Sequence, residues 1–132
     1  MGEGTGMILR NTEGEFLLQF RDGAEGIGYP LHWDLFGGGV EVGETILESA
    51  QRELWEELEL KVSLDDLREV GKAVSREGIL NYFVEYVRPV WMEDLRLREG
   101  AGWGFFTIEE IQRLQSVHEM VLVMARNLAV SR

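Results

Sequence analysis

Three glutamates with no lysine among them, Glu53, Glu56 and Glu57, stand close together in the middle of the chain. Their i, i+3, i+4 spacing places all three within about a third of the circumference of an α-helix. Carboxylates crowded in this way repel one another unless a cation lies between them, and such hard oxygen ligands suit Mg²⁺ or Mn²⁺. The cluster therefore predicts a metal site, and the alternative interpretation is a solvated acidic helix face.

The residues around the cluster predict the helix that must carry it. Thr45 and Glu48 match the Ser/Thr-x-x-Glu capping box, in which each side chain satisfies a free backbone N–H of the other residue. The same box recurs at 107–110 and 116–119, which predicts two further helices near the end of the chain. After the first box, apolar residues follow at helical spacing and predict a helix over 45–58. These residues are Ile46, Leu47, Ala50, Leu54 and Leu58.

Alternating and β-rich segments predict the sheet. Residues 6–10 and 15–20 flank a turn-rich tetrapeptide and predict a β-hairpin, and 69–74 and 79–87 predict another antiparallel pair. Shorter candidate strands are 33–36, 95–97 and 103–106. The order of strands and helices predicts an α+β fold with a mixed or antiparallel sheet flanked by helices, in a single domain over residues 1–132.

Composition and charge exclude several classes of function. The absence of cysteine excludes disulfides, thiolate zinc sites and a cysteine nucleophile. A net charge of −11 with only 13 Lys and Arg argues against binding to a nucleic-acid polymer. A polyphosphate ligand would then need bound metal ions for much of its neutralisation. Neither a membrane span nor a signal peptide is indicated, so we expect a cytoplasmic protein without a membrane partner.

The acidic helix belongs to a longer pattern that resembles the Nudix box. Gly38 is followed by five residues and Glu44, and seven more residues lead to the segment 52–60, RELWEELEL. The box reads G-x5-E-x7-R-E-U-x-E-E-x-G-U, where U is a bulky aliphatic residue. Each specified position matches except one, where Glu59 replaces the family's Gly. Looser similarity at 33–38 and 103–106 extends the resemblance over most of the chain.

The resemblance implies the Nudix fold, in which a mixed β-sheet is sandwiched between helices (α/β/α). It also implies a metal-dependent hydrolase that cleaves the diphosphate linkage of a nucleoside diphosphate joined to another moiety, with Mg²⁺ or Mn²⁺ as cofactor. Glu53, Glu56 and Glu57 would be metal ligands, together with the backbone of Gly38. Gly38 and Glu44 would also belong to the substrate-binding site.

Arginine and base roles have more than one interpretation. The resemblance implies that Arg52 orients neighbouring carboxylates, and an ordinary exposed i,i+4 pair with Glu56 is the alternative. Glu99, shortly before the closing strand, is the candidate for a fourth acidic ligand. Glu53 and Glu99 are both candidates for the general base that deprotonates water. Arg21 either contacts the substrate phosphates or is a surface residue at a strand end.

Glu93 and Asp94 compete with Glu99 for the fourth acidic position. Neither His32 nor His118 has a His or Cys partner at metal spacing, so both are expected to be structural or surface residues. Four aromatic residues could stack against the substrate, although each is more typical of a core. They are Phe20, Tyr29, Trp33 and Phe83.

The substrate cannot be chosen from any motif in the chain. Nucleoside triphosphates, dinucleoside polyphosphates, ADP-ribose and nucleotide sugars all fit the resemblance, and family specificity lies in loops, here 22–30 and 88–102. Two other classes of function remain: a catalytically silent Nudix fold that binds nucleotides or proteins, and an acidic protein-interaction domain. The resemblance is also compatible with a homodimer.

Overall fold

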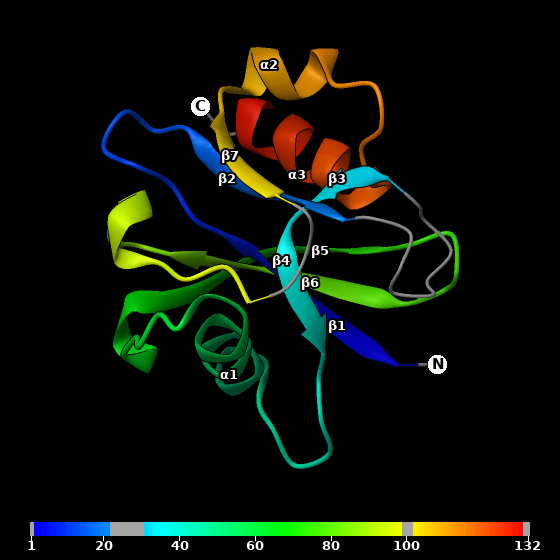
Figure 1. The fold of residues 1–132 in the computed structure, drawn as a ribbon. Coiled ribbons are helices and arrows are strands. Elements are labelled where there is room, and N and C mark those ends of the chain that lie inside the picture. Colours follow the sequence, from blue (N-terminus) through cyan, green and yellow to red (C-terminus); the bar gives the residue numbers. More distant parts are fainter. Residues whose placement is uncertain (1, 22–30, 99–101, 131–132) are drawn as a thin grey trace.

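The computed structural model describes residues 2–21, 31–98 and 102–130. The order of strands and helices along the chain is that of an α+β fold (Figure 1). The elements are β1 (Glu3–Ile8), β2 (Phe16–Arg21), β3 (His32–Asp34), β4 (Phe36–Gly39), α1 (Ile46–Leu58), the 3₁₀ turn Leu64–Asp66, β5 (Leu67–Val74), β6 (Leu80–Tyr86), the 3₁₀ turn Met92–Asp94, β7 (Gly102–Phe106), α2 (Ile108–Arg113) and α3 (Glu119–Val130).

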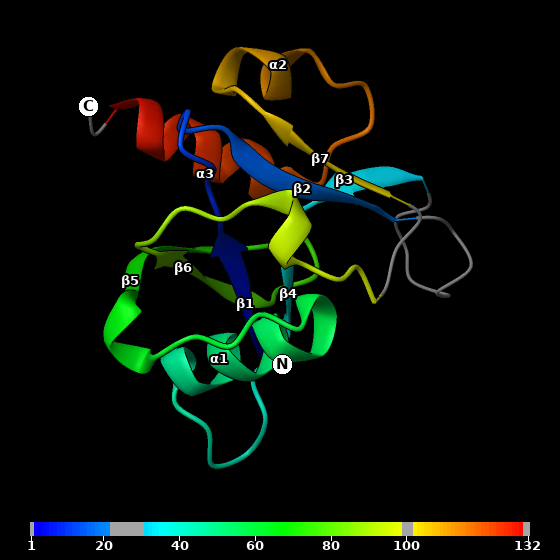
Figure 2. The ribbon, with the colours of Figure 1, turned by 60° about the vertical axis from the view of Figure 1, so that its left-hand side comes forward.

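The strands form two sheets. A mixed four-stranded sheet has the order β4-β1-β6-β5, in which β1 is antiparallel to β4 and parallel to β6. A three-stranded antiparallel sheet has the order β3-β2-β7. The α+β class and the helices that flank the sheets are as predicted from the sequence, and Figure 2 shows α1 well separated from α2 and α3.

The alternation of side chains along β1 divides the core in two. Met7 and Leu9 pack in one cluster with the apolar stripe of α1, including Leu54. Ile8, between them, packs in the other cluster with α3 residues such as Val121. Because successive strand residues point to opposite faces, β1 is buried on both sides. Helices α1 and α3 therefore lie on opposite sides of the four-stranded sheet.

The prediction that residues 6–10 and 15–20 form a β-hairpin is correct only at the turn between them. The Asn11 N–H donates to the Glu15 carbonyl at 3.1 Å, and Arg10 bridges Phe16, so the tight turn exists. Past it the chain separates, with β1 in the four-stranded sheet and β2 in the three-stranded one. Local alternation identifies strand faces, whereas long-range burial selects the partners.

The other predicted strands mostly form. β5 and β6 are the expected antiparallel pair, with a register shift between Glu69 and Gly71. The stretch 33–36 is divided between β3 and β4, and 103–106 lies in β7. The predicted strand at 95–97 is wrong. Its backbone instead follows the end of α1, where Arg96 N–H donates to the Leu58 carbonyl and Arg98 N–H to the Glu57 carbonyl, each at 2.9 Å.

Two of the three capping boxes form, at the starts of α1 and α2. The third is wrong, because α3 begins at Glu119 and the Ser116 carbonyl accepts a hydrogen bond from Trp33 N–H at 2.7 Å. His118 caps the helix instead: its Nδ1 accepts the Met120 N–H at 3.1 Å. Within the described residues, the helices are too short or too polar to cross a membrane.

Candidate active site

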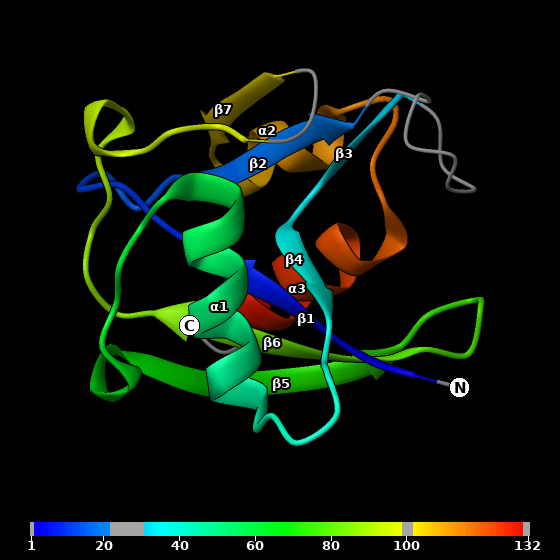
Figure 3. The ribbon, with the colours of Figure 1, turned by 60° about the horizontal axis from the view of Figure 1, so that its bottom comes forward.

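The centre of the site is a buried carboxyl at the junction of α1 and β4, which lie side by side in Figure 3. Glu57 is 3% exposed, and the Gly37 N–H donates to its two oxygens at 3.2 and 3.3 Å. Burial raises the pKa of Glu57 to about 9, with further contributions from the charge of Glu53 and a hydrogen bond to it. The sequence-predicted partners Glu53 and Glu57 are therefore brought together.

Glycines in β4 allow helix and strand to approach this closely. A Cβ on Gly38 would stand 2.5 Å from Glu53 Oε1 and 2.8 Å from Oε2. A Cβ on Gly37 would collide with the carbonyl oxygen of Thr5 in the neighbouring strand. Gly38 thus provides the space for the Glu53 carboxylate, and Gly37 provides the space for the close approach of β1.

Arg52 connects the helix to the loop that precedes it. Its Nε and Nη2 donate to the two oxygens of Glu44, at 2.6 and 3.0 Å, and Nη2 also donates to the Gly39 carbonyl at 3.0 Å. Nη1 donates to Glu53 at 2.8 Å and to Glu56 at 3.0 Å. The hydrogen bond from Arg52, followed by one from the Glu41 N–H, lowers the pKa of Glu44. Arg52 is therefore far more than an exposed i,i+4 partner.

Glu56 differs from the other two glutamates. Its side chain is 55% exposed and one oxygen accepts from Arg52. In the described part of the chain, no group of three or more acidic or histidine side chains is arranged to hold a metal ion as it stands. Arg52 donates to one oxygen of Glu53 and to one oxygen of Glu56. The donor chemistry still fits a cation, because the Glu53–Glu57 pair is unfavourable when both carboxyls are charged.

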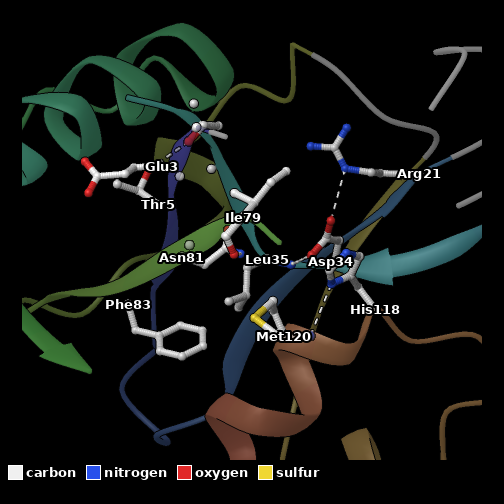
Figure 4. A pocket seen from close by; sticks show the side chains of 16 residues that line it. Glu3, Thr5, Arg21, Asp34, Leu35, Ile79, Asn81, Phe83, His118 and Met120 are labelled. Atoms are coloured by element: carbon white, nitrogen blue, oxygen red, sulfur yellow. Dashed lines mark hydrogen bonds and ion pairs between the residues drawn. The ribbon is translucent and has the colours of Figure 1, made fainter. Parts of the chain in front are cut away.

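A cavity of about 330 Å³ opens beside the glycines of β4. Arg21 and Asp34 lie on one side of it, and Asn81 and Phe83 come from β6 (Figure 4). The Arg21 side chain is only 16% exposed, with its Nε 3.4 Å from Asp34 Oδ2. Its charge also acts to lower the pKa of Glu57. Arg21 is thus the last residue of β2, with a largely shielded side chain near the carboxylate pair.

Sequence reasoning missed Asp34 and Asn81 as residues of this cavity. Asp34 carried a weak signal, since it directly precedes the segment that resembles the family's approach strand. Asn81 carried none, because only the parallel pairing of β1 with β6 places it opposite Gly4. His118 also lines the cavity, while buried His32 has its Nε2 3.6 Å from Asp34 Oδ2.

Of the four candidate aromatic residues, Phe83 lines the cavity. Trp33 packs against Phe20, with ring centroids 5.0 Å apart, and against Phe106 at 4.9 Å, so this group is a packed aromatic cluster. Tyr29 and Glu99 lie outside the described residues. The competitors of Glu99, Glu93 and Asp94, lie in the 3₁₀ turn Met92–Asp94.

Comparisons with known proteins agree with this geometry. A family model described as NUDIX domain matches residues 2–126. An uncharacterised Nudix hydrolase of Listeria monocytogenes is 33% identical over 118 residues, which cover 87% of this chain and 69% of that protein. A MutT protein of Methanosarcina mazei has a similar structure, with a TM-score of 0.81 and 21% identity over 98% of this chain and 94% of the other. An Ap4A hydrolase of Caenorhabditis elegans has a TM-score of 0.68 and 19% identity over 97% and 96% of the two chains.

The likeness to solved structures supports the fold, and the family match and the Listeria relative support membership. Nudix hydrolases generally use divalent metals and act on derivatives of nucleoside diphosphates. With its box at the junction of α1 and β4, this chain belongs to the Nudix hydrolase family.

Proposed function

We propose that this chain is a divalent-cation-dependent hydrolase that cuts the diphosphate linkage of a nucleoside diphosphate joined to another moiety. The observation that carries the proposal is the buried Glu57 carboxyl beside Glu53, held against glycines of β4 that also line a cavity. Two adjacent carboxyls in a largely buried place are stabilised when a cation neutralises them.

Glu53, Glu56 and Glu57, with the backbone of Gly38, would hold Mg²⁺ or Mn²⁺. For Glu56 this requires its side chain to turn away from Arg52, which its 55% exposure permits. A bound ion would neutralise the diphosphate oxygens and make a water easier to deprotonate.

The protein residues then divide the remaining work. We assign proton removal from the attacking water to Glu53. The Arg52 guanidinium orients this carboxylate, because its Nη1 donates a hydrogen bond to Oε1. Arg52 is itself held by Glu44, so Glu44 acts as a positioning residue. Arg21, whose guanidinium lies on the cavity side of the carboxylate pair, would contact the phosphates. Glu99 remains the other candidate base.

The cavity beside β4 is where we place the nucleoside or the group joined to it. Phe83 offers an aromatic face, and Asn81 and Asp34 offer polar atoms that can recognise a base or sugar. This lining does not choose among nucleoside triphosphates, dinucleoside polyphosphates, ADP-ribose and nucleotide sugars. The competing function is a catalytically silent fold that binds a nucleotide in the same cavity.

Separation of the reaction products by anion-exchange chromatography tests the proposal, because hydrolysis of these linkages yields two phosphorylated products and need not release free phosphate. Each substrate class, together with a 5′-triphosphorylated RNA, is incubated with Mg²⁺, with Mn²⁺ and with excess EDTA. We expect the protein to hydrolyse at least one small nucleotide. This hydrolysis should require a divalent cation and should stop when EDTA is in excess. Undiminished hydrolysis in EDTA would contradict the metal site. Tight binding without turnover of any compound would favour the silent fold, and preference for the RNA would contradict a small-molecule substrate.

A further inference from the structure

Another cavity, of about 480 Å³, lies at the opposite end of β1 from the candidate active site. Gly6 borders the active-site cavity, and Arg10, four residues along the chain, borders this one, which corresponds to a separation of roughly 13 Å. In Figure 1 this end of the four-stranded sheet is on the left, where β5 begins and β6 ends. The cavity is lined by Arg10, Asn11, Arg68, Glu85, Tyr86 and Arg88, among others.

The charge of this cavity is opposite to that of the chain. Three arginines and the carboxylate of Glu85 line it, and Asp66 pairs with Arg88 beside it, which gives a local balance of +1 in a chain with a net charge of −11. The active-site cavity, by contrast, is lined by Glu3, Asp34 and Arg21, a balance of −1 with His118 neutral. A small anion without a metal ion would therefore be attracted to the arginine cavity and repelled from the other.

The internal ion pairs compensate two of the three positive charges and leave one. Arg10 and Arg68 share the single carboxylate of Glu85: Arg10 Nη2 lies 3.1 Å from one oxygen, and Arg68 Nε and Nη2 donate to the other at 3.0 and 2.7 Å. Arg88 Nε donates to Asp66 at 2.8 Å. Three guanidinium groups carry about fifteen N–H donors, of which these contacts engage only a few.

Fold stability alone is a weak reason for this arrangement. The side chains of Arg68 and Arg88 are 67% and 66% exposed, and exposed ion pairs contribute at most about 1 kcal/mol each. Arg10 is held more firmly, with its guanidinium carbon 4.8 Å from the centre of the Phe16 ring and its side chain 26% exposed. Among the described residues, its buried Nε has no hydrogen-bond partner. One shielded and two exposed arginines around a hollow present guanidinium groups that can bind an oxyanion.

We propose that this cavity, which Arg10, Arg68 and Arg88 surround, binds the phosphate group of a small molecule independently of the catalytic metal. The three terminal oxygens of a phosphate can each meet one of the three guanidinium groups. A carboxylate has only two oxygens, so it can engage fewer of them. Tyr86, Val87 and Pro89 provide an apolar side to the cavity that an organic group on the phosphate could contact.

Titration of the whole protein with inorganic phosphate in EDTA tests the proposal, because metal-dependent binding at the glutamates is then removed. Backbone amide NMR shifts locate the site, and calorimetry gives its affinity. We expect saturable shifts centred on Asn11, Arg68 and Arg88, with little change at Gly37 to Gly39. Phenyl phosphate should give the same pattern, and tighter binding of it would identify an organic phosphate as the fitting ligand. Acetate should bind at least tenfold more weakly than phosphate.

The double variant Arg68→Gln, Arg88→Gln should lose at least tenfold in phosphate affinity while its circular dichroism is unchanged. Arg10 is left intact, because its side chain is only 26% exposed and also packs against the buried Phe16, so its removal would disturb the core. The matched control is Arg76→Gln, since Arg76 is 83% exposed and pairs with Glu119 away from this cavity. It should retain affinity within twofold.

Three results would overturn the proposal: no saturable phosphate binding by the parent protein, equal affinity of parent and double variant, or shifts centred on Gly37 to Gly39. An equal loss in Arg76→Gln would also overturn it, because it would show a general charge effect. Because the titration needs neither metal nor turnover, its failure is distinct from failure of the proposed hydrolase activity.

Discussion

The carboxylate of Glu53 lies against the backbone of Gly38 so closely that a Cβ on that glycine would stand 2.5 Å from Glu53 Oε1. Real Cβ atoms do not approach a neighbour at this distance, so the Glu53 carboxylate must leave its present position if Gly38 acquires a side chain. The Glu53 carboxylate is also held by Arg52 on its other side. The space at Gly38 is thus a geometric requirement of the site.

We therefore expect Gly38→Ala to lower turnover by at least a hundredfold, because a displacement of about 1 Å in a catalytic group has an effect of this size. Gly39→Ala is the matched control, since a Cβ there meets its nearest atom, the Glu3 carbonyl oxygen, only at 4.0 Å. Steady-state kinetics on both variants check this. Similar turnover of the two would show that Glu53 does not need its present position.

Glu57 should make the metal-free protein less stable as pH rises. Its pKa in the folded state, about 9, is above the ordinary value of 4.5, because burial and the charge of Glu53 oppose ionisation. The folded state therefore binds the proton more tightly than the unfolded state. The contribution of Glu57 to the free energy of unfolding is therefore greatest below pH 4.5. It falls between pH 4.5 and 9, at most by about 1.4 kcal/mol per pH unit.

Glu57→Gln removes this titration, so urea unfolding in EDTA at pH 6 and pH 8 should show a smaller loss of stability for the variant than for the parent. With metal, turnover of Glu57→Gln should fall by orders of magnitude, because the amide lacks the anionic ligand charge. Glu56→Gln should lose activity similarly. Identical pH profiles of parent and Glu57→Gln would contradict the pKa assignment, and near-full activity of either variant would contradict its role as a ligand.

Arg52→Lys should lower turnover about 10- to 100-fold, as is usual when a partner that orients metal ligands is changed. Lysine keeps the charge but cannot contact Glu44, Glu53 and the Gly39 carbonyl with the geometry of a guanidinium. Turnover and the activation curve for Mn²⁺ are the measurements. Arg76→Lys, an exposed arginine outside the site, is the control, and equal effects of the two substitutions would argue against a positioning role.

Glu59, which replaces the Gly of the Nudix box, has a left-handed backbone conformation with φ of 53°. Because glycine adopts this conformation without the steric penalty of a Cβ, Glu59→Gly should be about 1 kcal/mol more stable than Glu59→Ala. Both variants lose the ion pair between Glu59 and Arg98, so the comparison isolates the backbone. Thermal or urea unfolding measures the difference.

Turnover of Glu59→Gly should stay within about twofold of the parent, because Glu59 follows the helix face that carries the carboxylates. Relative to the parent, its gain in stability is reduced by loss of the exposed pair with Arg98, which contributes at most about 1 kcal/mol. A large fall in activity in both Glu59→Gly and Glu59→Ala would instead assign a function to that pair.

The amino-acid sequence by itself determined the elements and residue types of the site. The capping box at Thr45, the stripe that ends at Leu58 and the spacing of the glutamates are local properties, because helix periodicity and capping depend on residues three or four apart. For the same reason the β5–β6 pair, whose turn is short, was correctly predicted.

Only the tertiary structure decided how those residues meet. The burial of Glu57, and with it the direction of its pKa shift, depends on contact between α1 and β4, and the separation of β1 from β2 depends on which sheet buries each strand. Asn81 entered the active-site cavity through a parallel pairing between segments about 75 residues apart in sequence. The N-terminus of α3 is capped by His118 and not by Ser116, because the backbone of Ser116 is hydrogen-bonded to Trp33. Contacts at such separations are fixed by packing of the whole core, which no short sequence pattern records.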